Sequence, residues 1–384
     1  MLGDCYSAEF FRDIKNNRIR SALTQIADET QEDLLYYESV LKDFGCTVIR
    51  PELDHNDSIM NYVNEKNGAL HGRQGVPKSP LQPRDAQLII GNTALITQYD
   101  HFSIADALKQ YSNDTRDCRS APLPEFKYNE IWCRASGDWP KYSDYKVNHQ
   151  NKSFFKPHVW KELQDLDYNF FISLSSATVM MIGTQVFVPK TNYHTQIELD
   201  MLRSLPYFKD FDVNFHELDG HADGNFHPIK PGAILSLYDV QNYSETFPGW
   251  DVCYLPDQGL DKVEGFLKLK RQVSGKWWVP GQEDNSEFTH FVETWLNDWV
   301  GYVEETVFDV NVLVLDEHHV CVNNLNPTVV KFLKKHNMEP VLVPWRHRYF
   351  WDGGLHCITL DLYREGVQQD YFPERTHSII DKEF

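Results

Sequence analysis

The sequence predicts a mixed α/β fold in which short modules of hairpin, helix and strand repeat around a ring, as in an α/β propeller. Three observations support this prediction: apolar hairpins recur along the chain, an amphipathic helical pattern follows two of them, and a strand pattern follows each of those helices. A single module of this kind cannot bury its own apolar face, so several modules must pack together. We therefore expect one domain that spans residues 1–384.

Hairpins are predicted where alternating apolar runs flank a short polar turn. Three stretches have this pattern: QLIIGNTALIT (87–97), VMMIGTQVFVP (179–189) and NVLVLDEHHVCVNN (311–324). The first two turn at Gly91 and Gly183, and the third turns at Asp316 and Glu317. The hairpin is therefore the recurrent unit of the sequence.

A helix and then a strand follow two of the hairpins. Residues 191–205 and 326–338 have helical patterns, and residues 208–218 and 339–345 have strand patterns. In the last of these helices Pro327 stands near the start and lysines stand at the end, as is typical of helix termini. The order hairpin, helix, strand is thus predicted twice.

The remaining segments are assigned with fewer signals. Residues 30–45 form an amphipathic helical pattern that ends at Gly45, and residues 46–53 follow it as a strand. Two segments rich in polar and aromatic residues, 101–159 and 274–286, are predicted to be insertions on the ring rather than separate cores.

Composition excludes several classes of function. The formal net charge is −19 and no stripe of lysine and arginine is present, which argues against a nucleic-acid partner. The seven cysteines are an odd number without zinc-ligand spacing, so we expect reduced thiols. The first residues lack a signal-peptide pattern, and no apolar run reaches the roughly 18 residues of a membrane span. We predict a cytoplasmic protein without a membrane partner.

The first candidate for chemistry is Cys357, in FWDGGLHCITLDLYREG (350–366). The residues after it alternate between apolar and polar, which predicts that Cys357 begins a half-buried strand. Gly353 and Gly354 permit a backbone path that other residues disfavour, and such a turn can hold a thiol at the rim of a cavity. The competing interpretation is structural, because free cysteines are among the most buried residues.

The second candidate is HELDGHADGNFHP (216–228). On an extended segment His221 and Asp223 point the same way and could face one substrate together. A polar turn is the simpler interpretation, because Asp, Gly and Asn are common in turns. A metal site of His216, His221, Asp223 and His227 ranks below the thiol hypothesis, because its spacing matches no familiar metal-binding pattern.

The third candidate is Asp85, in QPRDAQLIIGN (82–92). A carboxylate at the mouth of a strand is well placed to bind a cation. On local grounds, a charged residue that simply ends a strand is the commoner explanation.

In this order, the three stretches resemble the arginine:glycine amidinotransferase family, within the guanidino-group-modifying superfamily and its five-bladed pentein fold. The similarity covers nearly the whole chain and is strongest at the GGxHCxTxD motif of residues 353–361. Residues 220–236 resemble the family's HxD block with PGxxLS, and PRD at 83–85 resembles its N-terminal block.

The resemblance implies a role for each of these residues. Cys357 would be the nucleophile that takes the amidino group, and His221 would be the general acid and base. Asp85 and Asp223 would hold the guanidinium by paired charge-assisted hydrogen bonds. The implied reaction moves an amidino group from arginine or an analogue to glycine or a different amine, through a covalent S-amidino-cysteine. The resemblance implies no metal and no organic cofactor.

Two departures concern catalysis. Where the family has FDAAD, this chain has LSSAT (174–178), so Ser175 takes the place of the aspartate that orients the catalytic histidine, and Thr178 takes the place of a second acid. An orienting carboxylate holds the imidazole tautomer, and its loss costs orders of magnitude in rate in serine proteases. Either another acid replaces it or the activity is altered.

Two departures concern specificity. Val240 stands where the family has a carboxylate-binding arginine, and Glu304 and Glu305 stand where it has two serines. A pocket that loses a cation and gains acids favours a substrate end that is positive, and Glu304, Glu305 and Ser175 are predicted to bind substrate. The opposing interpretation is that the glutamates form a solvated face and that an arginine from an insertion replaces the missing one.

Three functions stay open on the sequence. The first is amidino transfer between a small guanidino donor and an amine acceptor. The second is hydrolysis of a guanidino group, in which water replaces the acceptor amine, and the third is a binding protein of the same fold that has lost turnover. Among oligomeric states, a homodimer is left open.

Overall fold

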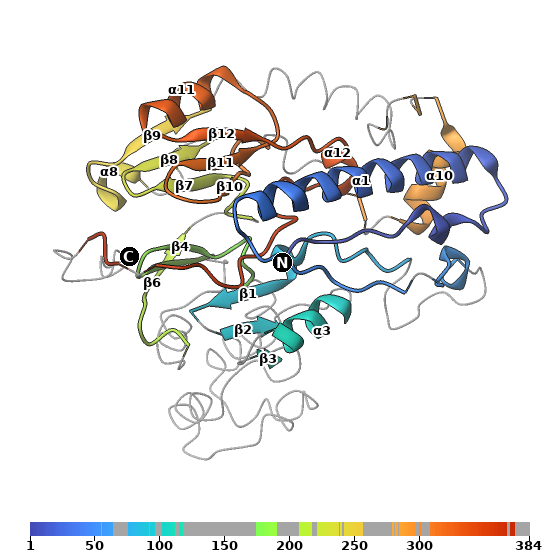
Figure 1. The fold of residues 1–384 in the computed structure, drawn as a ribbon, viewed down its shortest axis with the longest axis horizontal. Coiled ribbons are helices and arrows are strands. Elements are labelled where there is room, and N and C mark those ends of the chain that lie inside the picture. Colours follow the sequence, from blue (N-terminus) through green and yellow to red (C-terminus); the bar gives the residue numbers. More distant parts are fainter. Residues whose placement is uncertain are drawn as a thin grey trace, which may run out of the picture.

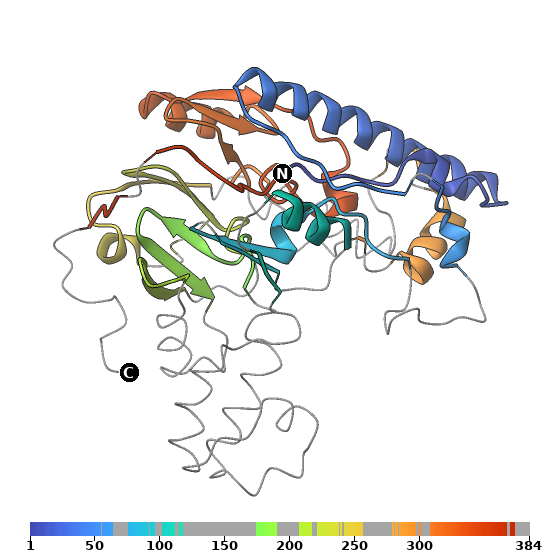
Figure 2. The same ribbon diagram turned by 60° about the horizontal axis from the view of Figure 1, so that its bottom comes forward.

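The computed structural model describes residues 1–54, 56–63, 76–91, 93–96, 102–111, 115–117, 174–189, 207–216, 221–237, 239, 242–255, 279, 281–282, 284–296, 299–300, 308–366 and 369–372. Four three-stranded sheets within these residues share one topology. In each sheet the first two strands form an antiparallel hairpin, and the third strand runs parallel to the second. The repeated module predicted from the sequence is therefore confirmed, and Figures 1 and 2 show the sheets arranged around the molecule.

The strands of these sheets are short. The first sheet contains β1 (Gln87–Ile90), β2 (Thr93–Ile96) and β3 (Thr115–Asp117); the second contains β4 (Met180–Ile182), β5 (Gln185–Pro189) and β6 (Asp212–His216); the third contains β7 (Phe226–Lys230), β8 (Ala233–Ser236) and β9 (Asp251–Tyr254); the fourth contains β10 (Leu313–Val314), β11 (His319–Val322) and β12 (Glu339–Leu342). All three predicted hairpins are present, together with a fourth, β7 and β8, that was not predicted as one.

Glycines make the tight turns of two hairpins. Gly91 and Gly183 have φ values of 54° and 61°, a left-handed conformation that glycine adopts without steric cost. At Gly183 a side chain would also overlap the carbonyl oxygen of Gln369, which accepts a hydrogen bond from the Thr184 amide at 3.0 Å. The second hairpin thus binds the segment around Gln369, which follows the loop of Cys357.

A helix connects the second and third strands wherever the described residues include the connection. These helices are α3 (Phe102–Tyr111), α8 (Tyr243–Thr246) and α11 (Pro327–Lys335). The start of α11 follows from its sequence, because Asn326 Oδ1 accepts the Thr328 amide at 2.9 Å and Pro327 needs no amide partner. Its buried face, Val329, Phe332 and Leu333, packs on the strands of its own sheet.

The prediction that residues 101–159 are an insertion is wrong where the structure describes them. Ile104 and Leu108 of α3 pack against Ala94 and Ile96 of β2, and β3 pairs in parallel with β2. These residues complete the first module, and their helical pattern was hidden by polar sequence on both sides. Of the second predicted insertion, 274–286, Ser286 begins α10 (Ser286–Trp295), and the rest of both ranges lies largely outside the described residues.

The two ends of the chain together form a fifth module. Leu2 pairs with Thr359 in an antiparallel bridge, and the Gly3 amide donates to the Ile358 carbonyl at 2.8 Å. On its other side Leu2 donates to the Ile49 carbonyl at 2.8 Å, and α1 (Asn17–Asp43) connects these segments. Two extended segments, a helix and a third extended segment follow the order of the other modules, although the first segment comes from the C-terminal part and none is a regular strand.

The first helix differs from its prediction in length. It begins at Asn17, because Asn16 Oδ1 accepts the amides of Arg18 and Ile19, rather than near residue 30. It ends before Gly45, whose φ of 81° fits the predicted stop. Residues 46–53, predicted as a strand, contribute the Ile49 carbonyl to the pairing but form no regular strand.

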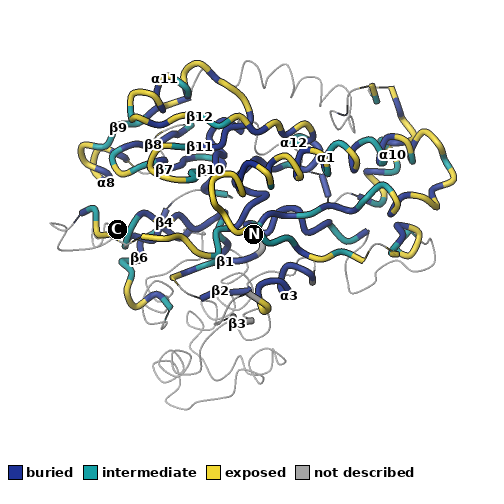
Figure 3. Tube along the Cα trace, viewed as in Figure 1, coloured by how far each residue is buried: buried dark blue, intermediate teal, exposed yellow. Residues whose placement is uncertain are grey.

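The largest apolar core lies beneath α1 (Figure 3). It joins α1 to α10, to the short helices at Ala8–Phe11, Ile59–Asn61 and α12 (Arg348–Trp351), and to the loop before Cys357. The loop before Cys357 is thus anchored on one side by an aromatic-rich core. None of the described helices combines the length and the apolar composition that a bilayer crossing requires.

Candidate active site

Cys357 lies in a buried turn that follows α12, and its side chain is fully buried. The predicted half-buried strand at this point is wrong, because residues 355–358 form turns and only Thr359 makes a strand-like bridge. Arg84 explains the difference: its Nε lies 2.8 Å from the His356 carbonyl oxygen and 2.7 Å from that of Thr359. Carbonyls that a strand would direct to a neighbour are bound by a side chain instead.

The two glycines before Cys357 serve close packing rather than an unusual backbone path. Neither Gly353 nor Gly354 has a positive φ. A side chain on Gly353 would overlap Gln82 Nε2, and one on Gly354 would overlap Asn311 Oδ1. The glycine pair therefore lets the side-chain amides of Gln82 and Asn311 pack closely against the loop of Cys357.

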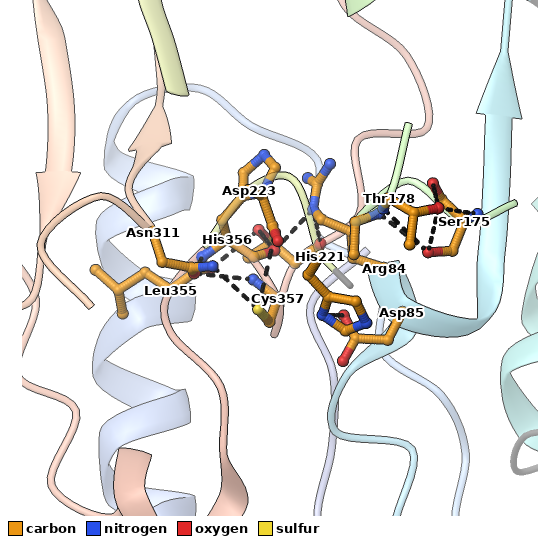
Figure 4. Close-up of polar contacts among 12 residues, drawn as sticks. Arg84, Asp85, Ser175, Thr178, His221, Asp223, Asn311, Leu355, His356 and Cys357 are labelled. Carbon is orange, nitrogen blue, oxygen red and sulfur yellow. Dashed lines mark hydrogen bonds and ion pairs between the residues drawn. The ribbon is translucent and has the colours of Figure 1, made fainter. Parts of the chain in front are cut away.

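Asn311 contacts this loop at both ends of its amide. Its Oδ1 accepts the backbone amides of His356 at 2.9 Å and Cys357 at 3.3 Å, and its Nδ2 donates to Cys357 Sγ at 3.1 Å (Figure 4). The sequence analysis did not identify Asn311, His356 or Arg84 as site residues. The PRD triplet could have indicated Arg84, because Arg84 directly precedes the candidate residue Asp85 in the sequence.

His221 and Asp85 approach the sulfur from two other modules. One ligand-type atom from each of Asp85, His221 and Cys357 lies within 4.8 Å of the other two. His221 Nδ1 is 3.9 Å from Asp85 Oδ1, and the two side chains are 32% and 19% exposed (Figure 4). Asp85 lies in α2 (Pro83–Ala86), directly before β1. A buried thiol therefore faces a partly exposed imidazole and carboxylate, as nucleophilic catalysis requires.

Asp223 also lies near the sulfur, and its side chain is fully buried. Its Oδ2 is 3.7 Å from Cys357 Sγ and 2.6 Å from His356 Nδ1, whereas its Oδ1 has no hydrogen-bond partner among the described residues. Burial raises the pKa of this carboxyl, while the neighbouring His221 and Arg84 act in the opposite direction. A buried oxygen without a partner, beside a nucleophile, is suited to receive a donor from a ligand.

Two further histidines surround Asp223 without reaching the solvent. His227 and His356 stack edge to face, with ring centroids 4.6 Å apart. Burial lowers the pKa of both imidazoles well below the ordinary value, and Arg84 lowers that of His356 further. Burial therefore favours the neutral form of both rings.

Ser175 occupies a buried turn rather than a position against His221. Its Oγ accepts the amides of Ala177 and Thr178, both at 3.3 Å. The Ala177 carbonyl in turn accepts the amides of Ala222 at 2.8 Å and Asp223 at 3.2 Å. In the described part of the chain, Ser175 thus supports the loop of His221 and Asp223 from below.

Several predicted residues are not described. Glu304, Glu305 and Val240 lie outside the described residues, so their roles stay predictions from the sequence.

The structure brings together a different set of possible metal ligands from the predicted one. His216 turns its Nε2 to the Thr178 carbonyl oxygen at 2.6 Å, and His227 stacks on His356. The histidines of residues 216–228 do not gather around one point. Among the described residues, Asp85, His221 and Cys357 are the group whose donor atoms could share one ion.

A cavity lies apart from these residues. Its volume is about 1680 Å³, and its wall includes the ends of the chain, from Met1 and residues 41–49 to residues 359–365. None of Asp85, His221, Asp223 and Cys357 lines it.

Comparisons with known proteins identify distant relatives of this chain. No model of a known protein family matches the chain. The L-arginine:L-lysine amidinotransferase of Pseudomonas savastanoi pv. phaseolicola is 22% identical over 378 residues, which cover 94% of this chain and 85% of that protein. This chain is a distant homologue of the L-arginine:L-lysine and glycine amidinotransferases. The mitochondrial glycine amidinotransferase of Danio rerio is 26% identical over 206 residues, which cover 51% of this chain but only 40% of the relative.

Solved amidinotransferase and pentein structures share the mixed α/β fold of this chain over most of its length. An amidinotransferase from Microseira wollei, of the saxitoxin biosynthetic pathway, superposes with a TM-score of 0.54 at 17% identity and covers 91% of this chain and 87% of its own. The N-terminal domain of ArgZ, bound to a covalent reaction intermediate, has a TM-score of 0.50 at 9% identity and covers 94% of this chain and 96% of its own. The predicted mixed α/β pentein fold is confirmed.

Proposed function

We propose that this amidinotransferase homologue transfers an amidino group from a guanidino donor, arginine or an analogue, to an amine acceptor. The observation that supports it is the convergence of Cys357 Sγ, His221 and Asp85 within 4.8 Å, with Asp223 3.7 Å from the same sulfur. A planar guanidinium between two carboxylates would be held by charge-assisted hydrogen bonds. Its central carbon would then face the thiol.

In the first half-reaction Cys357 Sγ attacks the guanidinium carbon and forms a C–S bond. The bond from that carbon to the donor's substituted nitrogen breaks, and His221 supplies the proton that this nitrogen needs to leave as an amine. An S-amidino group remains on Cys357. Its two nitrogens keep the positive charge, which Asp85 and Asp223 balance.

In the second half-reaction the acceptor amine attacks the carbon of the S-amidino group. His221 takes a proton from the acceptor nitrogen, the C–S bond breaks, and the electron pair returns to the sulfur as thiolate. One guanidino compound is consumed and another is formed. The scheme is ping-pong, because the first product leaves before the acceptor reacts.

The acceptor is proposed to carry a positive side chain rather than to be glycine. The support is the sequence, in which Val240 replaces a cationic side chain and Glu304 and Glu305 add negative charge. A relative that spans most of this chain is named for L-lysine as well as L-arginine. Lysine is therefore the first acceptor to test.

The assay combines labelled arginine with a panel of amines that includes lysine, ornithine and glycine. A new guanidino product that requires both arginine and an amine supports transfer. Cys357→Ser should abolish it, whereas Cys253→Ser, a change at another buried free cysteine, should retain it. No product with any amine, from protein shown to be folded, contradicts the proposal.

Hydrolysis is the second candidate, because the same cysteine, histidine and carboxylates suffice when water replaces the acceptor. One structural neighbour is the N-terminal domain of ArgZ, an arginine dihydrolase. Release of ammonia or urea from arginine without any amine present would identify the hydrolytic reaction.

A further inference from the structure

The side chain of Asn311 has an orientation that its neighbours determine. Its Oδ1 is the only side-chain oxygen it has, and two backbone amides, those of His356 and Cys357, point to it at 2.9 and 3.3 Å. If the amide were rotated by half a turn, two N–H groups would face an NH₂ group. The nitrogen of Asn311 must therefore point to the Cys357 sulfur, 3.1 Å away.

An N–H donor at this sulfur matters because burial and the carboxylates of Asp223 and Asp85 disfavour negative charge there, and His221, within 4.8 Å, favours it only when protonated. The Cys357 side chain is fully buried, and the Asp223 carboxylate oxygen lies 3.7 Å from Sγ. Burial and a nearby carboxylate both oppose a thiolate, which is the form that attacks. Hydrogen bonds to the charged form are the third influence on ionisation, and they act in the opposite direction.

The backbone holds Asn311 in place for this contact. Residues 310–312 form a tight turn in which the Val312 amide donates to the Val310 carbonyl at 2.9 Å, with Asn311 at its apex. Val310 and Val312 are buried in the core of the fourth sheet. On the other side, Gly354 leaves space for Oδ1 that any side chain would fill.

We propose that Asn311 is a catalytic residue whose side-chain N–H stabilises the thiolate of Cys357. It does so before the sulfur attacks the guanidinium carbon, and again when the C–S bond breaks and the electron pair returns to sulfur. This inference rests on the proposed function in that it takes Cys357 as the nucleophile. It adds a second role for the same side chain, since Oδ1 fixes the loop while Nδ2 contacts the reacting atom.

The test measures thiolate formation directly. The ultraviolet absorbance of the thiolate is titrated against pH and corrected by the same variant carrying Cys357→Ser, so that tyrosines and other cysteines cancel. Asn311→Asp keeps the oxygen that accepts the two backbone amides and replaces the N–H donor with a second oxygen. Asn311→Ala removes the donor without adding charge. Asn214→Asp, at a buried asparagine that instead bonds Gln185 Oε1 at 2.9 Å, is the matched control.

Both Asn311 variants should raise the midpoint pH of thiolate formation by about one unit or more, and Asn214→Asp should leave it unchanged. If Asn311→Ala does not fold, as judged by circular dichroism, Asn311→Asp decides alone. A midpoint equal to that of the parent protein in every folded Asn311 variant overturns the inference.

The inference and the proposed function can fail separately. A shifted midpoint without any S-amidino adduct in the parent protein would retain Asn311 as the donor to the thiolate and remove the transfer reaction. An S-amidino adduct in the parent protein, with an unshifted midpoint in the Asn311 variants, would support the transfer reaction and overturn the role of Asn311.

Discussion

His356 Nδ1 lies 2.6 Å from Asp223 Oδ2, so the residue next to the nucleophile binds one of the two carboxylates that are proposed to hold the substrate. This contact fixes the direction in which the carboxylate points. The other oxygen, Oδ1, has no hydrogen-bond partner within the described part of the chain, so it can accept a donor from a ligand.

Replacing His356 with glutamine should weaken donor binding more than turnover. Without the ring, Asp223 loses its fixed orientation and a buried hydrogen bond, which is worth about 1.5–3 kcal/mol when one partner is charged. We expect the KM for the donor to rise about 10-fold or more, with a smaller change in kcat, in steady-state kinetics. The control is His347→Gln, because His347 makes an equally short contact, 2.6 Å, with Glu29 on α1. An unchanged KM in the His356 variant would contradict this role.

Stability should fall as the pH is lowered below about 6.5, the ordinary histidine pKa. Burial lowers the pKa of His227 and His356, so the folded protein leaves both neutral while the unfolded chain protonates them. The unfolded state then binds more protons, and each group contributes up to about 1.4 kcal/mol of destabilisation per pH unit. The raised pKa of Asp223 acts in the opposite direction, toward the acid end of the range.

Chemical denaturation between pH 7.5 and 5.5 would measure this dependence. His227→Gln should reduce the slope of unfolding free energy against pH by about half of the two-histidine contribution. A slope equal to that of the parent protein would show that His227 takes up a proton in the folded state.

Gly354→Ala should disrupt the site even though the residue has ordinary backbone angles. The new Cβ would overlap Asn311 Oδ1 and displace the amide that holds the His356 and Cys357 backbones. Gly45→Ala is the matched comparison, because φ there is 81° but no atom lies within 4 Å of the added carbon.

We expect Gly45→Ala to cost about 1 kcal/mol of stability with catalysis retained. Gly354→Ala should instead lose at least about 100-fold in kcat/KM, or about 2.7 kcal/mol of transition-state stabilisation. Equal activities of the two variants, measured after melting curves confirm folding, would be inconsistent with close packing at Asn311.

Ser175→Ala should reduce stability through the turn below the catalytic loop. The hydroxyl accepts hydrogen bonds from two backbone amides, and the loss of these bonds costs about 1 kcal/mol. Because Ala177 contacts the loop of His221 and Asp223, we also expect a decrease of a few-fold in kcat. Ser79→Ala is the control, since Ser79 is buried and its Oγ has no hydrogen-bond partner. A Ser175 variant as stable and active as the Ser79 variant would refute this support role.

The modules could be predicted because their signals are local. Apolar residues alternate on both sides of Gly91 and Gly183, and Pro327 marks the beginning of its helix within one residue. The fifth module could not be predicted in this way. Its pairing is limited to an isolated bridge, in which Leu2 pairs with Thr359 from the opposite end of the chain.

The site could be predicted only in part. Glycines and a histidine beside Cys357 drew attention to the thiol, but the roles of Asn311 and Arg84 depend on tertiary packing. Arg84 binds the carbonyls that a strand after Cys357 would have used, and the alternation of residues 358–363 therefore led to a wrong prediction of secondary structure. By resemblance, Ser175 was assigned the position of the aspartate that orients the catalytic histidine. In the structure its hydroxyl accepts amides of its own turn instead.

The central claim is that Cys357 forms a covalent bond with the amidino group of a guanidino donor. Mass spectrometry of the protein after incubation with isotope-labelled arginine and a panel of analogues, without an acceptor, measures this most directly. We predict that one labelled amidino group is added, that peptide mapping assigns it to Cys357, and that an amine acceptor removes it. Failure to detect an adduct on Cys357 with any donor, across the pH range in which the thiol ionises, would contradict the account.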